Sequence, residues 1–137
     1  MIVPDDAVAV EIEVPFHDVD ALHVVWHGHY YKYFEIARTA LFRDRGLDQT
    51  FYLDQGVALV VMESQCRYKV PLRFGDRGRV AAWFGELDHT MTIRFEMTNT
   101  STGRRCATGR TRMATLDSEG KLLTSIPDAI LSKIKKP

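Results

Sequence analysis

Cysteine is scarce in this chain, with only Cys66 and Cys106 among 137 residues. A disulfide framework needs several cysteines, and a structural zinc site needs closely spaced pairs, so neither arrangement fits this sequence. We therefore expect both cysteines to be reduced thiols packed in the interior, where this residue behaves as a small apolar side chain.

Long apolar runs and a surplus of charge of either sign are also missing. No window approaches the roughly 20 apolar residues that span a bilayer, and the first residues, MIVPDDAVAVEIEV, lack the basic start of a secretion signal. The 18 basic and 18 acidic residues cancel, which leaves no net field to attract nucleic acid or an anionic membrane. We expect a cytoplasmic protein without a membrane span or a nucleic-acid partner.

The chain does contain 45% hydrophobic residues in a length suited to one core, so we expect a single domain over residues 1–137. From Val8 to Phe16, apolar and polar residues alternate as in a half-buried strand. Between Tyr30 and Leu41 the apolar residues instead recur at helical spacing. This stripe predicts a helix from about His29 to Arg45, with Gly46 just past its end.

The patterns after Gly56 favour strands. The apolar run VALVVM is followed by an alternation of apolar with basic residues and proline from Cys66 to Phe74. Three further strand-like segments, RVAAWFGEL, TMTIRFEMT and RRCATGRTRMATL, are separated by turn-forming residues. The segment PDAILSKI predicts a short final helix, with Pro127 suited to its first turn.

The resulting order is one strand, one long helix, and then four or five strands. A single helix covers only one face of an antiparallel sheet, so this order predicts an α+β fold. A highly curved sheet of five or six strands could enclose the helix. Pairing of an exposed edge strand with a second copy would remove an aggregation hazard and produce a dimer.

The most distinctive stretch is FHDVDALHVVWHGHYYKYFEIAR, residues 16–38, with two Asp and four His in its first fourteen positions. It resembles the opening signature of the hotdog-fold acyl-CoA thioesterases of the 4-hydroxybenzoyl-CoA thioesterase type, which include a subgroup associated with the Tol–Pal envelope system. YKVPLRFGDRGRV is similar to a second segment of that family, a strand that passes a proline and reaches a Gly-Asp turn.

The resemblance covers about residues 8–134, and it implies a hotdog fold in which a curved antiparallel sheet wraps a long central helix. It implies hydrolysis of an acyl thioester, carried by coenzyme A or by an acyl-carrier protein, to a free acid and a thiol. It further implies a homodimer or homotetramer with its sites at subunit interfaces. The sequence does not distinguish the two carriers.

The resemblance also implies the catalytic residues. It places the family's catalytic aspartate on Asp20. It places on His27 the backbone N–H that polarises the carbonyl, and also a catalytic histidine of the Tol–Pal-associated subgroup. A carboxylate can attack a thioester or activate water, and N–H groups at a helix start can stabilise the oxyanion. Neither step needs a cofactor or a metal.

Two further acidic residues are candidates for supporting roles. We expect the Asp18 side chain to support the loop backbone. Glu35 lies eight residues after His27, about two helical turns along the same face, and a related hotdog branch uses a helix carboxylate at this spacing. Because Glu35 also stands three residues before Arg38, we expect a salt link between these two.

Two histidines depart from the pattern of the family. His23 and His29 stand where relatives usually carry Gly and Asn, and a histidine in a glycine position bears directly on the loop's backbone conformation. In related thioesterases a basic turn contacts the nucleotide, but here the corresponding turn, ELDHTM, offers only His89 and Thr90. We expect these two residues and Tyr30 to contact the substrate.

Three other functions fit parts of the same stretch. DVDALH resembles the Asp-x-Asn-Pro-x-His motif of hotdog (R)-specific enoyl-CoA hydratases, although Asp20 and Ala21 replace its Asn and Pro. A non-catalytic acyl-thioester-binding protein is a second alternative. A metal site is a third, because carboxylates and imidazoles suit Zn²⁺; its candidate ligands are His17, Asp18, Asp20, His23, His27 and His29.

Overall fold

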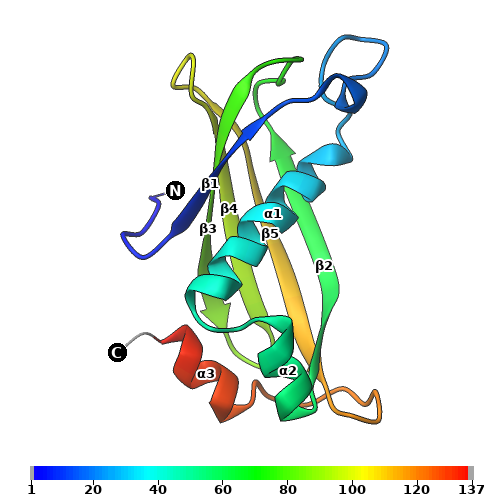
Figure 1. Cartoon of the computed structure of the whole chain (residues 1–137), viewed down its shortest axis with the longest axis vertical. Coiled ribbons are helices and arrows are strands. Elements are labelled where there is room, and N and C mark those ends of the chain that lie inside the picture. Colours follow the sequence, from blue (N-terminus) through cyan, green and yellow to red (C-terminus); the bar gives the residue numbers. More distant parts are fainter. Residues whose placement is uncertain (1, 136–137) are drawn as a thin grey trace.

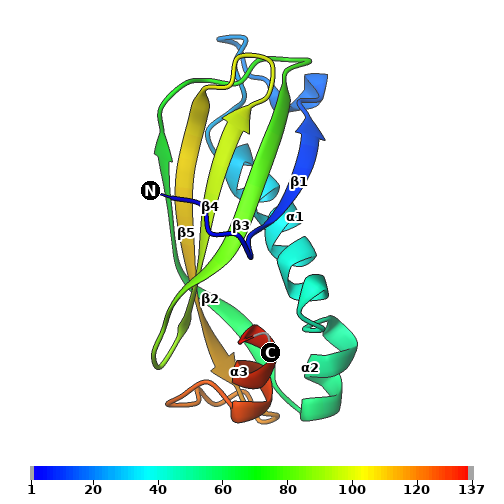
Figure 2. The same ribbon diagram turned by 90° about the vertical axis from the view of Figure 1, so that its left-hand side faces the viewer.

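The computed structural model describes residues 2–135 as a five-stranded antiparallel sheet with one long helix across it (Figure 1). The strands are ordered β1-β3-β4-β5-β2. Their bounds are Val8–Glu13 for β1, Ala58–Tyr68 for β2, Arg77–Leu87 for β3, Met91–Asn99 for β4 and Arg105–Leu116 for β5. The view in Figure 2 shows the sheet curving with the helix on one side of it. The predicted α+β hotdog fold is confirmed.

The long helix α1 spans His29–Asp44, close to the predicted range, and Gly46 follows it with a φ of 71°. The short final helix α3, Asp128–Ile134, begins directly after Pro127, as predicted. A further helix, α2 (Gln49–Gln55), was not predicted. Its seven residues are too few to display a helical stripe, although its start and end are well marked. The Asp48 carboxylate accepts a hydrogen bond from the Phe51 N–H.

Two predicted strand boundaries were wrong. β1 ends at Glu13, because Pro15 cannot donate to a strand ladder and Phe16 opens a 3-10 turn, η1 (Phe16–Asp18). The run VALVVM and the residues after it form one strand, β2, with a register shift between Val61 and Glu63. The predicted alternation beyond Tyr68 is not strand, since Pro71 interrupts the ladder.

The core lies between α1 and the sheet. The predicted stripe of Tyr30, Phe34, Ala37 and Leu41 is buried. Phe34 stacks on Phe95 of β4 with ring centroids 4.6 Å apart. A Cβ on Gly109 of β5 would lie 2.4 Å from the Phe34 ring, so only glycine leaves room for that ring here. Burying such an aromatic pair contributes several kcal/mol by area, on the order of 2–3 kcal/mol per ring.

The packing of α1 is uneven across the sheet. The helix lies against β1 and β3, whereas the edge strand β2 stands apart from it (Figure 1). Three hollows follow α1 along this side of the molecule.

Within residues 2–135, no helix combines the length and the apolar character needed to cross a bilayer. Both cysteines are unpaired; Cys106 is buried and Cys66 is half-buried.

Candidate active site at the start of the long helix

A tight hairpin precedes α1 and carries the predicted catalytic aspartate. Val19 and Val25 pair in an isolated antiparallel bridge, and the Asp20 N–H donates to the Val24 carbonyl at 2.9 Å. His23 closes the turn by donating its N–H to the Asp20 carbonyl, with a φ of 66°. This is a three-residue hairpin whose last loop residue is left-handed, a position that favours glycine. The histidine therefore keeps the glycine-type loop conformation.

Asp20 itself is half-buried at the tip of this hairpin. Its Oδ1 accepts a hydrogen bond from the Leu22 N–H at 2.8 Å, which makes an Asx turn. Its Oδ2 accepts no hydrogen bond from any residue in the range 2–135. Oδ1 is therefore bonded within the turn, whereas Oδ2 is available to a ligand.

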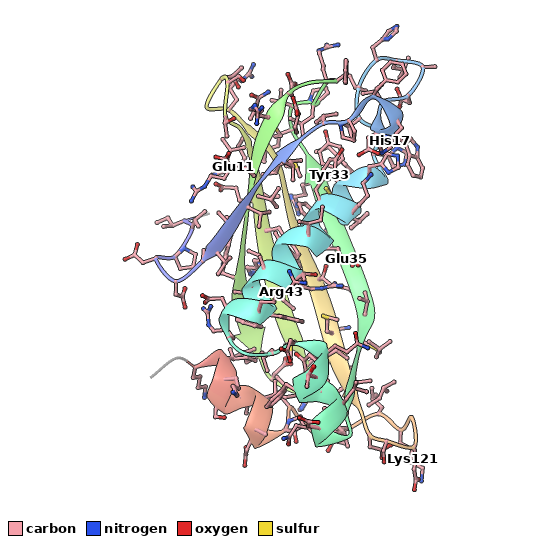
Figure 3. The ribbon with its side chains drawn as sticks, viewed as in Figure 1. Glu11, His17, Tyr33, Glu35, Arg43 and Lys121 are labelled. Atoms are coloured by element: carbon pink, nitrogen blue, oxygen red, sulfur yellow. The ribbon has the colours of Figure 1, made fainter. Side chains whose placement is uncertain are left out.

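Asp18 is the buried anchor of the loop, with its side chain fully shielded from solvent. It accepts hydrogen bonds of 2.6 Å from both Lys32 Nζ and Tyr33 Oη, and Figure 3 shows Tyr33 reaching from α1 toward this end of the molecule. The prediction that its side chain supports the loop backbone was wrong, because both partners are side chains of α1. The contacts of Asp18 with the loop backbone come from its own backbone: its N–H donates to the Pro15 carbonyl at 3.1 Å, and its carbonyl accepts from the Trp26 N–H at 3.0 Å.

The surroundings of Asp18 favour its ionised form. Burial alone would raise the pKa of Asp18, but the hydrogen bonds from Lys32 and Tyr33 outweigh it, so the net shift is downward. Burial and the bond to Asp18 raise the pKa of Tyr33, which keeps its hydroxyl a donor. The His17 and His29 Nε2 atoms lie 3.5 and 3.8 Å from Asp18 Oδ1. Both predicted loop histidines at these positions therefore face the anchor.

The helix start presents backbone donors. The His29 N–H donates to the Trp26 carbonyl at 2.9 Å, whereas in the described chain the N–H groups of His27 and Gly28 have no acceptor. The indole of Trp26 lies on Gly28, where a Cβ would come within 2.2 Å of the ring. Unpaired amides at the positive end of a helix dipole suit a developing oxyanion.

A hollow of about 260 Å³ adjoins this helix start. Tyr68, at the end of β2, donates its hydroxyl to the His27 carbonyl at 2.7 Å and packs edge-on to Tyr30 at 4.9 Å. Tyr30 is buried, and its hydroxyl accepts from the Leu72 N–H at 3.3 Å, so its ring forms a wall of the hollow. The remaining lining includes Lys69, Val70 and Pro71.

Sequence reasoning missed the contribution of Tyr68 and Lys69 to this hollow. Tyr68 is one of the apolar residues in the alternation predicted from Cys66 to Phe74, which would place it on the buried face of a strand, yet the residue is 46% exposed. The available signal was the proline three residues later, which ends the strand and turns the chain toward α1.

Other predicted site residues do not gather here. His89 and Thr90 lie in the turn between β3 and β4. β3 begins beside the catalytic hairpin, because its first residue, Arg77, pairs with Glu13 at the end of β1. Its 11 residues then extend away from the hairpin over roughly 35 Å. The two residues are therefore at the opposite end of the sheet within one chain.

Glu35 lies on α1 beside a second hollow, of about 400 Å³, toward β2 (Figure 3). The predicted salt link to Arg38 is absent, since no oxygen of Glu35 comes within 4.0 Å of the Arg38 guanidinium. Both side chains instead line the same hollow, together with Tyr31 and Ser64.

The fold brings three of the six candidate metal ligands, His17, Asp18 and His29, close together and separates the other three from them. Asp18 is buried against α1, Asp20 holds its own turn, and His23 and His27 are exposed. Among residues 2–135, no three His, Cys, Asp or Glu side chains are arranged to hold a metal ion.

Comparison with known proteins identifies the family. The model of the thioesterase-like superfamily matches residues 14–134. This chain belongs to the thioesterase-like superfamily. The putative acyl-CoA thioesterase YneP of Bacillus subtilis is 31% identical over 83 residues, which are 61% of this chain and 60% of YneP. A putative esterase of Aquifex aeolicus is 36% identical over 46% of this chain, and that match spans only about half of its own length, 49%.

Solved structures extend the likeness of this thioesterase-like chain to nearly its whole length. A hypothetical protein from Aquifex aeolicus matches with a TM-score of 0.83 and 29% identity, over 93% of this chain and 98% of that one. A hypothetical protein from Thermus thermophilus matches with a TM-score of 0.82 and 26% identity, over 93% and 96% of the two chains.

Proposed function

We propose that this protein hydrolyses an acyl thioester of coenzyme A or of an acyl-carrier protein to a carboxylic acid and a thiol. The observation that carries the proposal is the hairpin that leads into α1. It joins a carboxylate with a free oxygen, on Asp20, to the unpaired amides of His27 and Gly28 beside an open hollow. Family membership supports the same reaction class.

Each group has a distinct part in the proposed reaction. The amides of His27 and Gly28 hold the oxygen of the thioester carbonyl as it becomes negative. Asp20 Oδ2 either attacks the carbonyl carbon, giving an anhydride that water cleaves, or removes a proton from the attacking water. In both routes the carbon–sulfur bond breaks and the thiol leaves with one proton. Asp18 fixes the hairpin against α1.

The carrier arm is proposed to enter past Tyr68 and Lys69. Both carriers bring phosphates, and Lys69 supplies a cation at the edge of the hollow beside the helix start. The name of the YneP relative, a putative acyl-CoA thioesterase, supports coenzyme A as the carrier.

We further propose a homodimer, or a homotetramer built from it, paired along β2. This strand is a sheet edge of 11 residues without proline, and it exposes 46% of Val61 and 50% of Met62. Such an edge is a template for pairing unless it is covered. His89 and Thr90, at the far end of the sheet, can reach a thioester site only from a second copy.

The same proposal treats residues 1–137 as one catalytic domain that works in the cytoplasm. Its two unpaired cysteines support a reducing compartment.

A thiol-release assay tests the proposed function. Purified protein is given aryl-, short-chain and long-chain acyl-CoA, and the same acyl groups on a carrier protein, while free thiol is titrated. We expect release from at least one class. Absence of release from every substrate would contradict the proposal. Loss of the conjugated absorbance of crotonyl-CoA without thiol release would instead identify a hydratase.

A further inference from the structure

A third hollow lies at the end of α1 away from the hairpin. It measures about 680 Å³, is bordered by α1, α2 and the first residues of β2, and is open to solvent. Its walls combine apolar residues, among them Phe42, Leu47, Leu53, Leu59 and Met113, with polar and charged residues, among them Arg38, Arg43 and Asp48. The proposed reaction uses none of these residues.

One residue of the lining carries a polar group that lacks a partner. The hydroxyl of Tyr52, on α2, is buried and makes no hydrogen bond to any residue in the range 2–135. Burial raises the pKa of Tyr52, so its O–H remains a donor at neutral pH. A buried hydroxyl without an acceptor is unfavourable, and an acceptor brought by a ligand would relieve it.

A cation lies beside the same space. Arg38 lines both this cavity and the 400 Å³ hollow next to it, and in the described chain no carboxylate lies within 4.0 Å of it. Burial lowers the pKa of Arg38, although an arginine stays charged at neutral pH. Asp48, the acidic residue of the lining, uses its Oδ1 to cap α2. Glu35, which lines the neighbouring hollow with Arg38, favours its charge electrostatically, but neither Glu35 nor Asp48 forms a direct ion pair with it in the described chain.

We propose that this cavity binds the far end of the acyl group, and that Arg38 and Tyr52 select acyl chains ending in a carboxylate. The inference rests on the proposed thioesterase function. The apolar walls would take the methylene chain, and the terminal carboxylate would accept from Tyr52 Oη and pair with the Arg38 guanidinium. A methyl-terminated chain would leave both groups unpaired, which a site built from buried polar groups discriminates against strongly.

The three hollows mark a path for such a chain along α1. The first adjoins His27 and Tyr30, the second adjoins Tyr31, and the second and third share Arg38. The ten residues from Gly28 to Arg38 advance about 15 Å along the helix axis, which an extended acyl chain of about ten to twelve carbons spans. Antiparallel pairing along β2 would also bring the cavity of one copy toward the helix start of the other. The preference for a terminal carboxylate is the same whether the cavity belongs to the copy that holds the thioester or to its partner.

The test compares CoA thioesters in pairs of equal chain length, one ending in a methyl group and one in a carboxylate, from six to fourteen carbons. Wild-type protein, Arg38→Gln and Tyr52→Phe are assayed with each pair, and Arg79→Gln, which removes an exposed positive charge on β3, serves as the control. We expect wild type to prefer the carboxylate member of at least one pair by about tenfold or more in kcat/KM.

The variants complete the expected pattern. Arg38→Gln and Tyr52→Phe should each lower kcat/KM for that carboxylate substrate by about tenfold while changing the methyl partner less than about threefold. Arg79→Gln should keep the preference. Equal turnover of both members at every length, or equal losses on both in the variants, would overturn the selectivity and leave the thioesterase proposal standing. Failure to cleave any thioester would overturn both.

Discussion

Two aspartates separated by one residue have different environments and different parts in the site. Asp18 is buried and is held by Lys32 and Tyr33 of α1. Asp20 is half-buried, supports its own turn through Oδ1, and keeps Oδ2 free among the described residues. We infer that Asp18 acts on stability and on the placement of the hairpin, whereas Asp20 acts on the reaction.

Replacing Asp18 by Asn is therefore expected to destabilise the fold. The change leaves the Lys32 ammonium without its counter-ion and weakens a charge-assisted hydrogen bond, at a cost of about 2–3 kcal/mol in the free energy of unfolding. Urea unfolding at pH 7 measures this, with Asp20→Asn as the matched control that should lose less than about 1 kcal/mol. A stability of Asp18→Asn equal to that of wild type would show that the buried pair has no structural role.

The same carboxyl predicts a pH dependence. Because the pKa of Asp18 is lower in the folded protein than the ordinary value of an aspartate, its contribution to the free energy of unfolding is fully present above about pH 4 and is lost as the pH falls through the folded pKa. The stability difference between wild type and Asp18→Asn should therefore shrink when unfolding is measured at pH 3 instead of pH 7. A difference that stays constant over this range would contradict the assignment.

For single residues, the sequence predicted which residues belong to the candidate site better than it predicted which side chains they contact. The family signature was enough to nominate Asp20 and His27. It could not reveal that Asp18 is buried, because the residues that hold it lie 14 and 15 positions later, on α1. The spacing of Glu35 and Arg38 predicted a salt link, but both side chains face a hollow, where other orientations are open to them.

The hairpin and the start of α1 form the element that positions the proposed catalytic groups. Asp18 bonds one arm to the helix, and the Trp26 indole covers Gly28 at the helix start. Tyr68 ties the end of β2 to the same turn through the His27 carbonyl. The direction of the unpaired amides therefore depends on the packing of Trp26 as well as on the helix itself.

Gly28→Ala is expected to disturb this packing. Its Cβ would meet the Trp26 ring at 2.2 Å, so the indole must move and the amides shift with it. We expect kcat to fall about tenfold, since small misplacements at a reacting centre are costly, together with a shift in tryptophan emission.

A double-mutant cycle with Trp26→Ala provides the control for Gly28→Ala. In the Trp26→Ala background the added methyl group has no ring to displace, so Gly28→Ala should cause less than about a twofold loss there. Equal losses in both backgrounds would show that the indole does not set the position of the amides.

Element prediction failed where periodicity was too short or was interrupted. The seven residues of α2 carry a capping aspartate, Asp48, and a closing glycine, Gly56, but no measurable stripe. The sequence left open whether the region of β2 holds one strand or two, because the shift between Val61 and Glu63 breaks its alternation. The stripe of α1 was long and regular, and its bounds were predicted within one residue at the C-terminal end.

At the scale of the whole molecule, the main feature is an open side along α1 and β2. The helix lies against β1 and β3, while β2 leaves one edge of the sheet without a neighbour. The sequence predicted the types of the elements and their order along the chain apart from α2, but not the strand order β1-β3-β4-β5-β2. That order depends on long-range pairing, such as β1 with β3, which no local pattern records.

Pairing along β2 predicts the oligomeric state. Wild-type protein should elute with a mass of at least twice 15.7 kDa in light scattering coupled to size exclusion. Met62→Lys places a charge on the exposed edge and should give a monomer with a thioesterase rate reduced by about tenfold or more, because the sites are proposed to lie at the interface. Lys121→Gln, in an exposed turn at the far end of the molecule (Figure 3), is the control. A monomeric wild type with full activity would contradict the pairing.

The central claim is that Asp20 performs the chemistry at the start of α1. Its most direct test is the turnover number of Asp20→Asn with the best acyl thioester, measured on protein whose urea unfolding matches that of wild type. The substitution keeps the oxygen that accepts from Leu22 and removes the charge, so we predict a loss of at least about 100-fold in kcat. A turnover number within about threefold of wild type would contradict the claim.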